Sequence, residues 1–290
     1  MISQEKIHTK RFFKRFLIIF ISLLAILFTV IYITNLYSSK SELEIYKYNQ
    51  NIQVSKKLDK IRSKLDTVIS DINILVKYHD MINYIEKKDS VSKLYLTDLI
   101  YKIMTNKQYI NQIRLLSNDG KEIIKIIRKN NTVISIDKEN LQDKSHRSYF
   151  KNSLPLKINE MYITRLELNK EHNKIEIPYN PVIRFIVPVY SFDKKRYGFL
   201  VFNYSAKSLM EDTGIKQKHD INNNFMSDKE GYWLEGVDEK DKWGFILDSA
   251  KNKNIKLSNP PLWTKIQANK NGQFILSDGL YTFTKFTPKV

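Results

Sequence analysis

The chain of 290 residues contains no cysteine, which excludes disulfide bonds, thiolate catalysis and cysteine-ligated zinc. Glycine and proline are scarce, and neither occurs before Gly120. A first stretch that lacks both helix breakers favours long helices. The eight glycines never cluster, so the sequence has no glycine-rich phosphate loop. Stability must come from packing, for which a hydrophobic content of 42% is ample.

The charge is strongly one-sided, with a formal net charge of +17. Lysine outnumbers arginine, the lysines are spread along the chain, and acidic residues lie between them. This distribution is typical of a solvated surface, and we expect no nucleic-acid partner. A membrane-tethered interaction protein that binds anionic polymer or lipid through its basic surface stays open as an alternative.

One long apolar run, Phe16 to Ile33, is free of charge. Basic residues precede it, namely Lys6, Lys10, Arg11, Lys14 and Arg15. We predict a membrane-spanning helix over 16–37, a cytoplasmic leader over 1–15, and an extracytoplasmic, periplasmic remainder at the cell membrane. A cleaved secretory signal is the competing interpretation. The length of the run and the lack of an A-x-A pattern after it favour a retained anchor.

Residues 38–108 are predicted to form stalk and scaffold helices. An apolar seam with helical spacing comprises Val54, Leu58, Ile61, Leu65, Val68, Ile72 and Leu75. The seam either packs on its own domain or also meets the same helix of a second subunit, which would make a homodimer through the stalk helices. A second helix is predicted over 90–105.

The pattern changes after Tyr109 to short β-branched runs. Two turns, Asn118 to Gly120 and Asn130 to Asn131, separate three runs and predict an antiparallel meander. A helix is expected over 138–154, followed by strands at 161–168, 175–177, 182–190 and 197–204, which gives a sheet of about five strands. A smaller cycle is expected from near Ile221, with hairpins at 225–234 and 274–286. The fold class is therefore α+β, with modules at 109–212 and 213–290.

These pieces together resemble the double Cache (PAS-like) extracytoplasmic sensor domains of bacterial transmembrane receptors, from about Ser38 to the end. The segments that carry the resemblance are Ser145 to Phe150, Met161 to Thr164, Val182 to Tyr190, Tyr197 to Tyr204, Gly231 to Leu234 and Trp243 to Phe245. The resemblance implies the signal-input module of a histidine kinase, diguanylate cyclase or chemoreceptor. It also implies a cytoplasmic output domain that this sequence does not contain, so we expect a fragment of a longer receptor or a truncated gene product, with an incomplete second module.

The resemblance implies a small extracellular ligand in the first module, held by Arg147, Tyr149 and Tyr162, with Phe150 in the same motif. A guanidinium is a planar fork of donors that suits a carboxylate. Arg184 lies in an apolar strand and is either a second cation of the pocket or outward-facing.

Asn203 stands where amino-acid-binding members of this family have an aspartate for the ligand amine. Because Asn203 cannot supply that charge, an organic acid is favoured over an amino acid.

Catalysis has little support in the sequence. A triad of Ser145, His146 and Asp143 would need adjacent residues to point at one another, and the five histidines lack metal-ligand spacing. We expect no enzyme activity, no metal and no cofactor, and an exported enzyme is the least favoured class.

Overall fold

The computed structural model of the chain describes residues 2–212 and 224–288. It opens with α1, a continuous helix over Ile2–Val76. Within the described part of the chain, α1 is the one helix long and apolar enough to cross a membrane, with a mean hydropathy of 3.0 over its most apolar window. The hydroxyls of Ser22 and Thr29 donate to Ile18 O and Ala25 O. Polar side chains in this segment are therefore satisfied by the helix itself, as a lipid environment requires.

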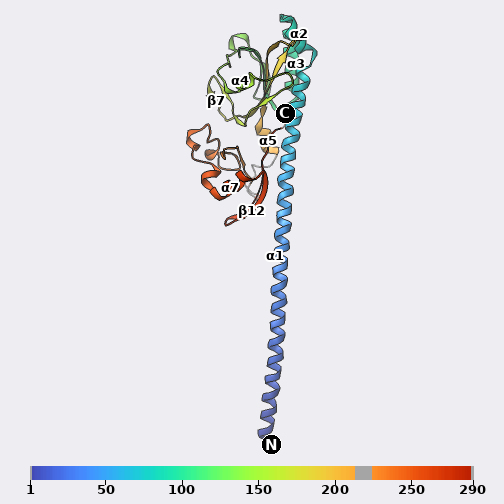
Figure 1. Cartoon of the computed structure of the whole chain (residues 1–290), viewed down its shortest axis with the longest axis vertical. Helices are drawn as coiled ribbons and strands as arrows, with labels where there is room; N and C mark the ends of the chain where they lie inside the picture. The colour runs from blue at the N-terminus through green and yellow to red at the C-terminus, as the bar shows by residue number, and fades with distance from the viewer. Residues whose placement is uncertain (1, 213–223, 289–290) are drawn as a thin grey trace. The chain divides into compact units, whose positions relative to one another are not determined.

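Two shorter helices follow, α2 (His79–Lys87) and α3 (Ser90–Asn106), next to the C-terminal part of α1 (Figure 1). The Asp89 side chain caps α3 by accepting from Ser92 N at 2.7 Å. Buried side chains of α1 and α3 share one core, namely Leu65, Val68, Ile72, Leu75, Leu96, Ile100 and Met104. The apolar seam of α1 thus packs on its own domain from Leu65 onward, and its pairing with a second subunit stays a prediction.

The main sheet is antiparallel and has seven strands in the order β3-β2-β1-β9-β8-β4, with β5 also paired to β8. Its strands are β1 (Ile110–Ser117), β2 (Glu122–Lys129), β3 (Thr132–Ser135), β4 (Tyr162–Ile163), β5 (Glu167–Leu168), β8 (Pro181–Tyr190) and β9 (Arg196–Ser205). The mixed α+β fold with a long N-terminal helix is confirmed. The expected strand at 161–168 is instead two short strands. Thr164 divides it, because its hydroxyl accepts from Arg184 N in place of a backbone carbonyl.

Two further expectations on this side of the sheet were wrong. The predicted helix over 138–154 is a single 3₁₀ turn, η1 (Lys138–Asn140), and a short helix, α4 (Ser148–Ser153), joined by irregular chain. The predicted strand at 175–177 does not join the sheet. Instead β7 (Lys174–Ile175) pairs with β6 (Lys170–Glu171) in a separate hairpin. Figure 1 shows α4 and β7 on the side of the sheet that α1 and α3 leave open.

After α5 (Ala206–Asp212) the predicted module boundary at 213 and the start near Ile221 lie outside the described residues. The following elements are β10 (Met226–Ser227), β11 (Trp233–Glu235), η2 (Glu239–Asp241), η3 (Asp248–Ala250), α6 (Ile255–Ser258), α7 (Pro260–Ala268), β12 (Asn271–Leu276) and β13 (Gly279–Thr284). They form two hairpins, β10-β11 and β12-β13, near the predicted positions. The residues up to Ser55 and Gly272–Phe283 form one unit of the chain, and the remainder forms another that contains the main sheet.

Candidate ligand-binding site

The face of the main sheet that carries the candidate site has an apolar half and a polar half. Alternation along the strands sends successive side chains to opposite faces. The apolar half comprises Leu116, Ile186, Phe199 and Val201, which pack with Tyr149 and Phe150 of α4. The polar half comprises Gln112 and Arg114 on β1, Lys125 on β2, Arg184 on β8 and Asn203 on β9, and all five side chains are buried. A polar surface of this size under a helix and a hairpin is a candidate ligand site.

Two of the predicted aromatic residues belong to the apolar half or its edge. The Phe150 ring meets the Phe199 ring edge-on at a centroid distance of 5.5 Å. Tyr162 is half-buried on β4, and its hydroxyl accepts from Asn152 Nδ2 at 3.1 Å. Phe150 thus packs within the apolar half, and Tyr162 packs at its edge.

Tyr149 connects the two halves of the face and is nearly fully buried. Its hydroxyl accepts from Arg114 Nη1 at 3.0 Å. Its ring has two guanidinium groups nearby, with the Cζ of Arg184 at 5.2 Å and that of Arg147 at 5.7 Å from the centroid. Both distances permit cation–π attraction. Three arginines thus converge on one tyrosine.

Arg147 differs from the other two arginines because it is half-buried and precedes α4 as its N-cap residue. Its backbone is anchored, since Arg147 N donates to Lys144 O at 3.0 Å. Within the described ranges, its guanidinium has no hydrogen-bond or ion-pair partner, and it lies beside the Tyr149 ring and near the like charge of Arg184. A positioned guanidinium with unused donors can bind a carboxylate through two parallel hydrogen bonds.

Arg184 is fully buried, so its outward-facing interpretation is wrong. Its Nη1 donates to the Glu167 carboxylate, and its Nη2 donates to Asn169 Oδ1 at 2.8 Å. Burial lowers the pKa of Arg184, and the Glu167 charge works against that effect. The pairing was missed in the sequence because Glu167 and Asn169 lie in the irregular segment around β5. Arg184 therefore has an internal counter-ion already.

A second cation cluster lies on the β1-β2 side of Tyr149 and surrounds the Glu171 carboxylate from β6. Arg114 Nη2 lies 3.2 Å from Glu171 Oε1, and Lys125 Nζ and Lys144 Nζ lie 3.1 and 3.8 Å from its Oε2. Burial disfavours the charged form of Glu171, but the three cations outweigh it and lower its pKa to about 2. The buried Glu122 carboxylate is the second acid of the cluster, 3.2 Å from Arg114 Nε.

Asn203 lies in β9 directly opposite Gln112 and Arg184 in the two neighbouring strands. Its Nδ2 donates to Gln112 Oε1 at 2.9 Å. Its Oδ1 is buried and has no hydrogen-bond partner among the described residues, and the same is true of Arg184 Nε. A buried polar atom without a partner is costly, so each of the two atoms could take part in a hydrogen bond with a polar group of a ligand.

Sequence reasoning missed Gln112, Arg114, Lys125, Lys144 and Glu171. The signal for Arg114 and Lys125 was present, since each is a single charge between apolar neighbours in a strand, as Arg184 is. Glu171 has no such signal, because a Lys-Glu-His-Asn-Lys segment is typical of an exposed turn.

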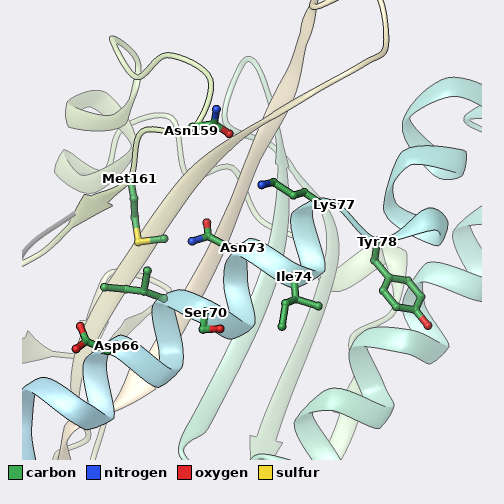
Figure 2. Close-up of a pocket in the computed structure, with 9 residues that line it drawn as sticks. Asp66, Ser70, Asn73, Ile74, Lys77, Tyr78, Asn159 and Met161 are labelled. Atoms are coloured by element: carbon green, nitrogen blue, oxygen red, sulfur yellow. The ribbon is translucent and has the colours of Figure 1, made fainter.

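A separate groove of about 740 Å³ lies along α1 and holds none of the predicted site residues. Figure 2 shows Asp66, Ser70 and Asn73 on α1 and Lys77 just after its end on one side, and Asn159 and Met161 on the other. Its two charged side chains, Asp66 and Lys77, are of opposite sign. The groove thus lacks the concentration of charge that distinguishes the polar half of the sheet face.

An antiparallel sheet with α1 and α3 on one face and α4 over the partly polar other face is a PAS-like arrangement. The chain belongs to the family of bacterial histidine kinase sensor domains, which matches residues 49–289. This agrees with the double Cache resemblance in the sequence.

Solved structures share the fold. A domain assigned to a sensory box/GGDEF family protein from Vibrio parahaemolyticus has a TM-score of 0.75 at 19% identity, with 83% of this chain and 90% of that one covered. The extracellular domain assigned to histidine kinase vpHK1S-Z8 has a TM-score of 0.74 at 20% identity, with coverage of 83% and 86%. The ligand-binding domain of Campylobacter jejuni chemoreceptor Tlp3, in complex with L-valine, has a TM-score of 0.57 at 15% identity, with coverage of 83% and 88%. Comparison with curated proteins gave no match.

Proposed function

We propose that this chain is the extracytoplasmic input module of a membrane-bound histidine kinase and that it binds a small carboxylate in the polar half of its main sheet. The N-terminal part of α1 spans the membrane, with its basic leader in the cytoplasm and the sheet outside. Ligand binding favours one arrangement of the sensor over another, and that difference is passed to the stalk helix.

The observation that carries the proposal is the Arg147 guanidinium, which is positioned at the Tyr149 ring and unpaired among the described residues. A carboxylate at this position would gain a charge-assisted, two-point hydrogen bond in a partly dry site. Arg184 and Asn203 add an unused donor and an unused acceptor nearby. Tlp3, which shares the fold, has been solved with L-valine and with isoleucine, and both carry a carboxylate.

An organic acid suits the site better than an amino acid. An ammonium group needs a free carboxylate or several free acceptors. The acids that contact the polar half, Glu167 and Glu171, are already paired with arginine or lysine. Asn203 Oδ1 offers one neutral acceptor, which suits a hydroxyl or amide of the ligand.

The test is a thermal-shift screen of the full chain in detergent micelles against organic acids, amino acids and amines. Hits are repeated with Arg147→Ala and with Lys151→Ala, an exposed cation on the same helix. We expect the Arg147→Ala variant to lose the shift and to bind at least 10-fold more weakly, because a hydrogen bond to a charged group is worth about 1.5–3 kcal/mol. Lys151→Ala should keep the shift. Equal shifts in wild type and Arg147→Ala would remove Arg147 from the site.

A further inference from the structure

We infer that the Glu171 carboxylate occupies an anion subsite when no ligand is bound. The second carboxylate of a dicarboxylate ligand replaces it there. The inference rests on the proposed function and deepens it, because it names the ligand class and the moving part.

The cluster around Glu171 holds three cations and two carboxylates. Arg114, Lys125 and Lys144 are all at most 5% exposed, and Glu122 is the one fixed acid, because it lies on β2 of the main sheet. Glu122 contacts Arg114 at 3.2 Å but lies 3.9 Å from both lysines. Lys125 therefore depends on Glu171 for its close carboxylate contact at 3.1 Å, whereas Lys144 lies at nearly equal distances from the two acids and donates to Gln142 Oε1 at 2.7 Å. Without Glu171 the cluster would hold two uncompensated buried charges, which is strongly unfavourable unless another anion enters.

Glu171 lies on a different part of the fold from Arg114 and Lys125. Arg114 and Lys125 lie on adjacent strands of the main sheet and face each other in register. Glu171 lies in the β6-β7 hairpin, which pairs with no strand of the main sheet. His172 and Asn173 close the hairpin with positive φ angles of 47° and 61°, as a two-residue turn requires. Arg114 and Lys125 are thus fixed by the main sheet, Lys144 lies in the irregular chain before α4, and the counter-ion Glu171 is on a small separate element.

The hairpin is attached mainly at its base. Asn169 N donates to Asn180 O at 2.8 Å and Glu176 N donates to Asn169 O at 3.0 Å. Near the tip, the contacts besides Glu171 are side-chain contacts of Gln142 with His172 at 3.4 Å and of His146 with Asn173 at 3.0 Å. The Glu171 side chain is 28% exposed, whereas its cation partners are 1–6% exposed. Solvent, and hence a solute, reaches the carboxylate before it reaches the cations.

The two anion positions lie at opposite ends of one side chain. Arg147 faces the Tyr149 ring, and Arg114 donates to the Tyr149 hydroxyl. A compact ligand with two carboxylates could contact both cations along Tyr149. Exchange of the Glu171 carboxylate for a ligand carboxylate keeps the lysines paired, so the exchange itself costs little electrostatic energy. The consequence is release of the β6-β7 hairpin, a change of structure that a ligand with one carboxylate would not cause.

The test compares wild type with Glu171→Gln in the full chain in detergent micelles, by calorimetric titration of succinate and of butyrate. Succinate must displace the Glu171 carboxylate in wild type, whereas the variant has no carboxylate to displace. The dissociation constant of succinate should therefore be at least 10-fold lower for Glu171→Gln than for wild type. Butyrate needs only Arg147, and its constant should change less than 2-fold. Glu139→Gln, an exposed acid in η1, is the matched control and should behave as wild type. Unchanged or weakened succinate binding in Glu171→Gln would overturn the inference.

A second measurement needs no variant. Hydrogen exchange of wild type with saturating succinate should show faster exchange for the amides of Lys170–Ile175 and slower exchange for α4. Slower exchange throughout the hairpin would contradict displacement of Glu171. If an Arg147-dependent ligand is found while succinate fails both tests, the inference fails and the proposed function stands. If no Arg147-dependent ligand exists, the proposed function itself fails.

Discussion

Two lysines of this chain, Lys144 and Lys242, are equally buried, with 3% exposure each, yet their pKa values shift in opposite directions. Burial lowers the pKa of Lys144 to about 8, with the charges of Arg114 and Lys125 acting in the same direction and those of Glu171 and Glu122 opposing it. Burial also opposes the charge of Lys242, but Glu235 and Glu239 outweigh it and raise the pKa. A buried lysine is therefore surrounded by more cations than acids in one region and by more acids than cations in the other.

The difference separates a structural charge cluster from a binding cluster. Lys242 lies 2.5 Å from Glu235 and 2.8 Å from Glu239, so its charge is fully compensated. The cluster around Lys144 holds three cations against two carboxylates, and the nearby Arg147 has no ion-pair partner in the described part of the chain. A cluster that is complete by itself stabilises a fold, and one that lacks an anion can bind one.

The largest expected effect is a loss of stability when the compensated cluster around Lys242 is broken. Lys242→Ala leaves the buried Glu235 carboxylate without a cation, so the free energy of unfolding should fall by about 3 kcal/mol. Chemical denaturation in micelles measures it, with Lys240→Ala as the exposed control. Ligand affinity should not change by more than 2-fold. A loss of stability no greater than in the control would show that the cluster near Lys242 is not structural.

The next effect is a pH dependence of stability that arises from the Glu171 cluster. The pKa of Glu171 is about 2 against an ordinary value of 4.5, so its ionised form stabilises the fold above pH 4.5 and this contribution is lost as the pH falls toward 2. Wild type should therefore lose on the order of 2 kcal/mol more than Glu171→Gln across this window. Thermal denaturation at stepped pH compares the two. Parallel curves would mean that Glu171 is not held by the cations.

The smallest effect concerns ligand choice at Asn203. Asn203→Asp places a carboxylate of the same shape beside Arg184, where it can pair with a ligand amine but also repels a ligand carboxylate. We expect affinity for an organic acid to fall several-fold relative to an amino acid, about 1 kcal/mol in preference. Competition titrations with butyrate and 2-aminobutyrate on both proteins measure the ratio. An unchanged ratio would place the amine-facing part of the ligand away from Asn203.

The long strands and the first helix could be predicted from the sequence, because β8 and β9 are mostly apolar runs buried on both faces, and α1 contains a long charge-free apolar run without glycine or proline. The two-residue strands could not be predicted, because the sequence of β6 is typical of a charged loop and its partner β7 contains a single apolar residue. Arg147, Tyr149 and Arg184 were found through motif and pattern. The Glu171 cluster could not be found in this way. Lys125 and Glu171 are 46 residues apart in the sequence, and a local sequence pattern carries no information on such a pairing.

The central claim is that Arg147 receives a ligand carboxylate on the polar half of the main sheet. A crystal structure with a ligand identified by the screen tests it most directly. The account predicts a ligand carboxylate within hydrogen-bond distance of the Arg147 guanidinium and next to the Tyr149 ring. A ligand bound in the groove along α1, with the Arg147 guanidinium free of it, would contradict the account.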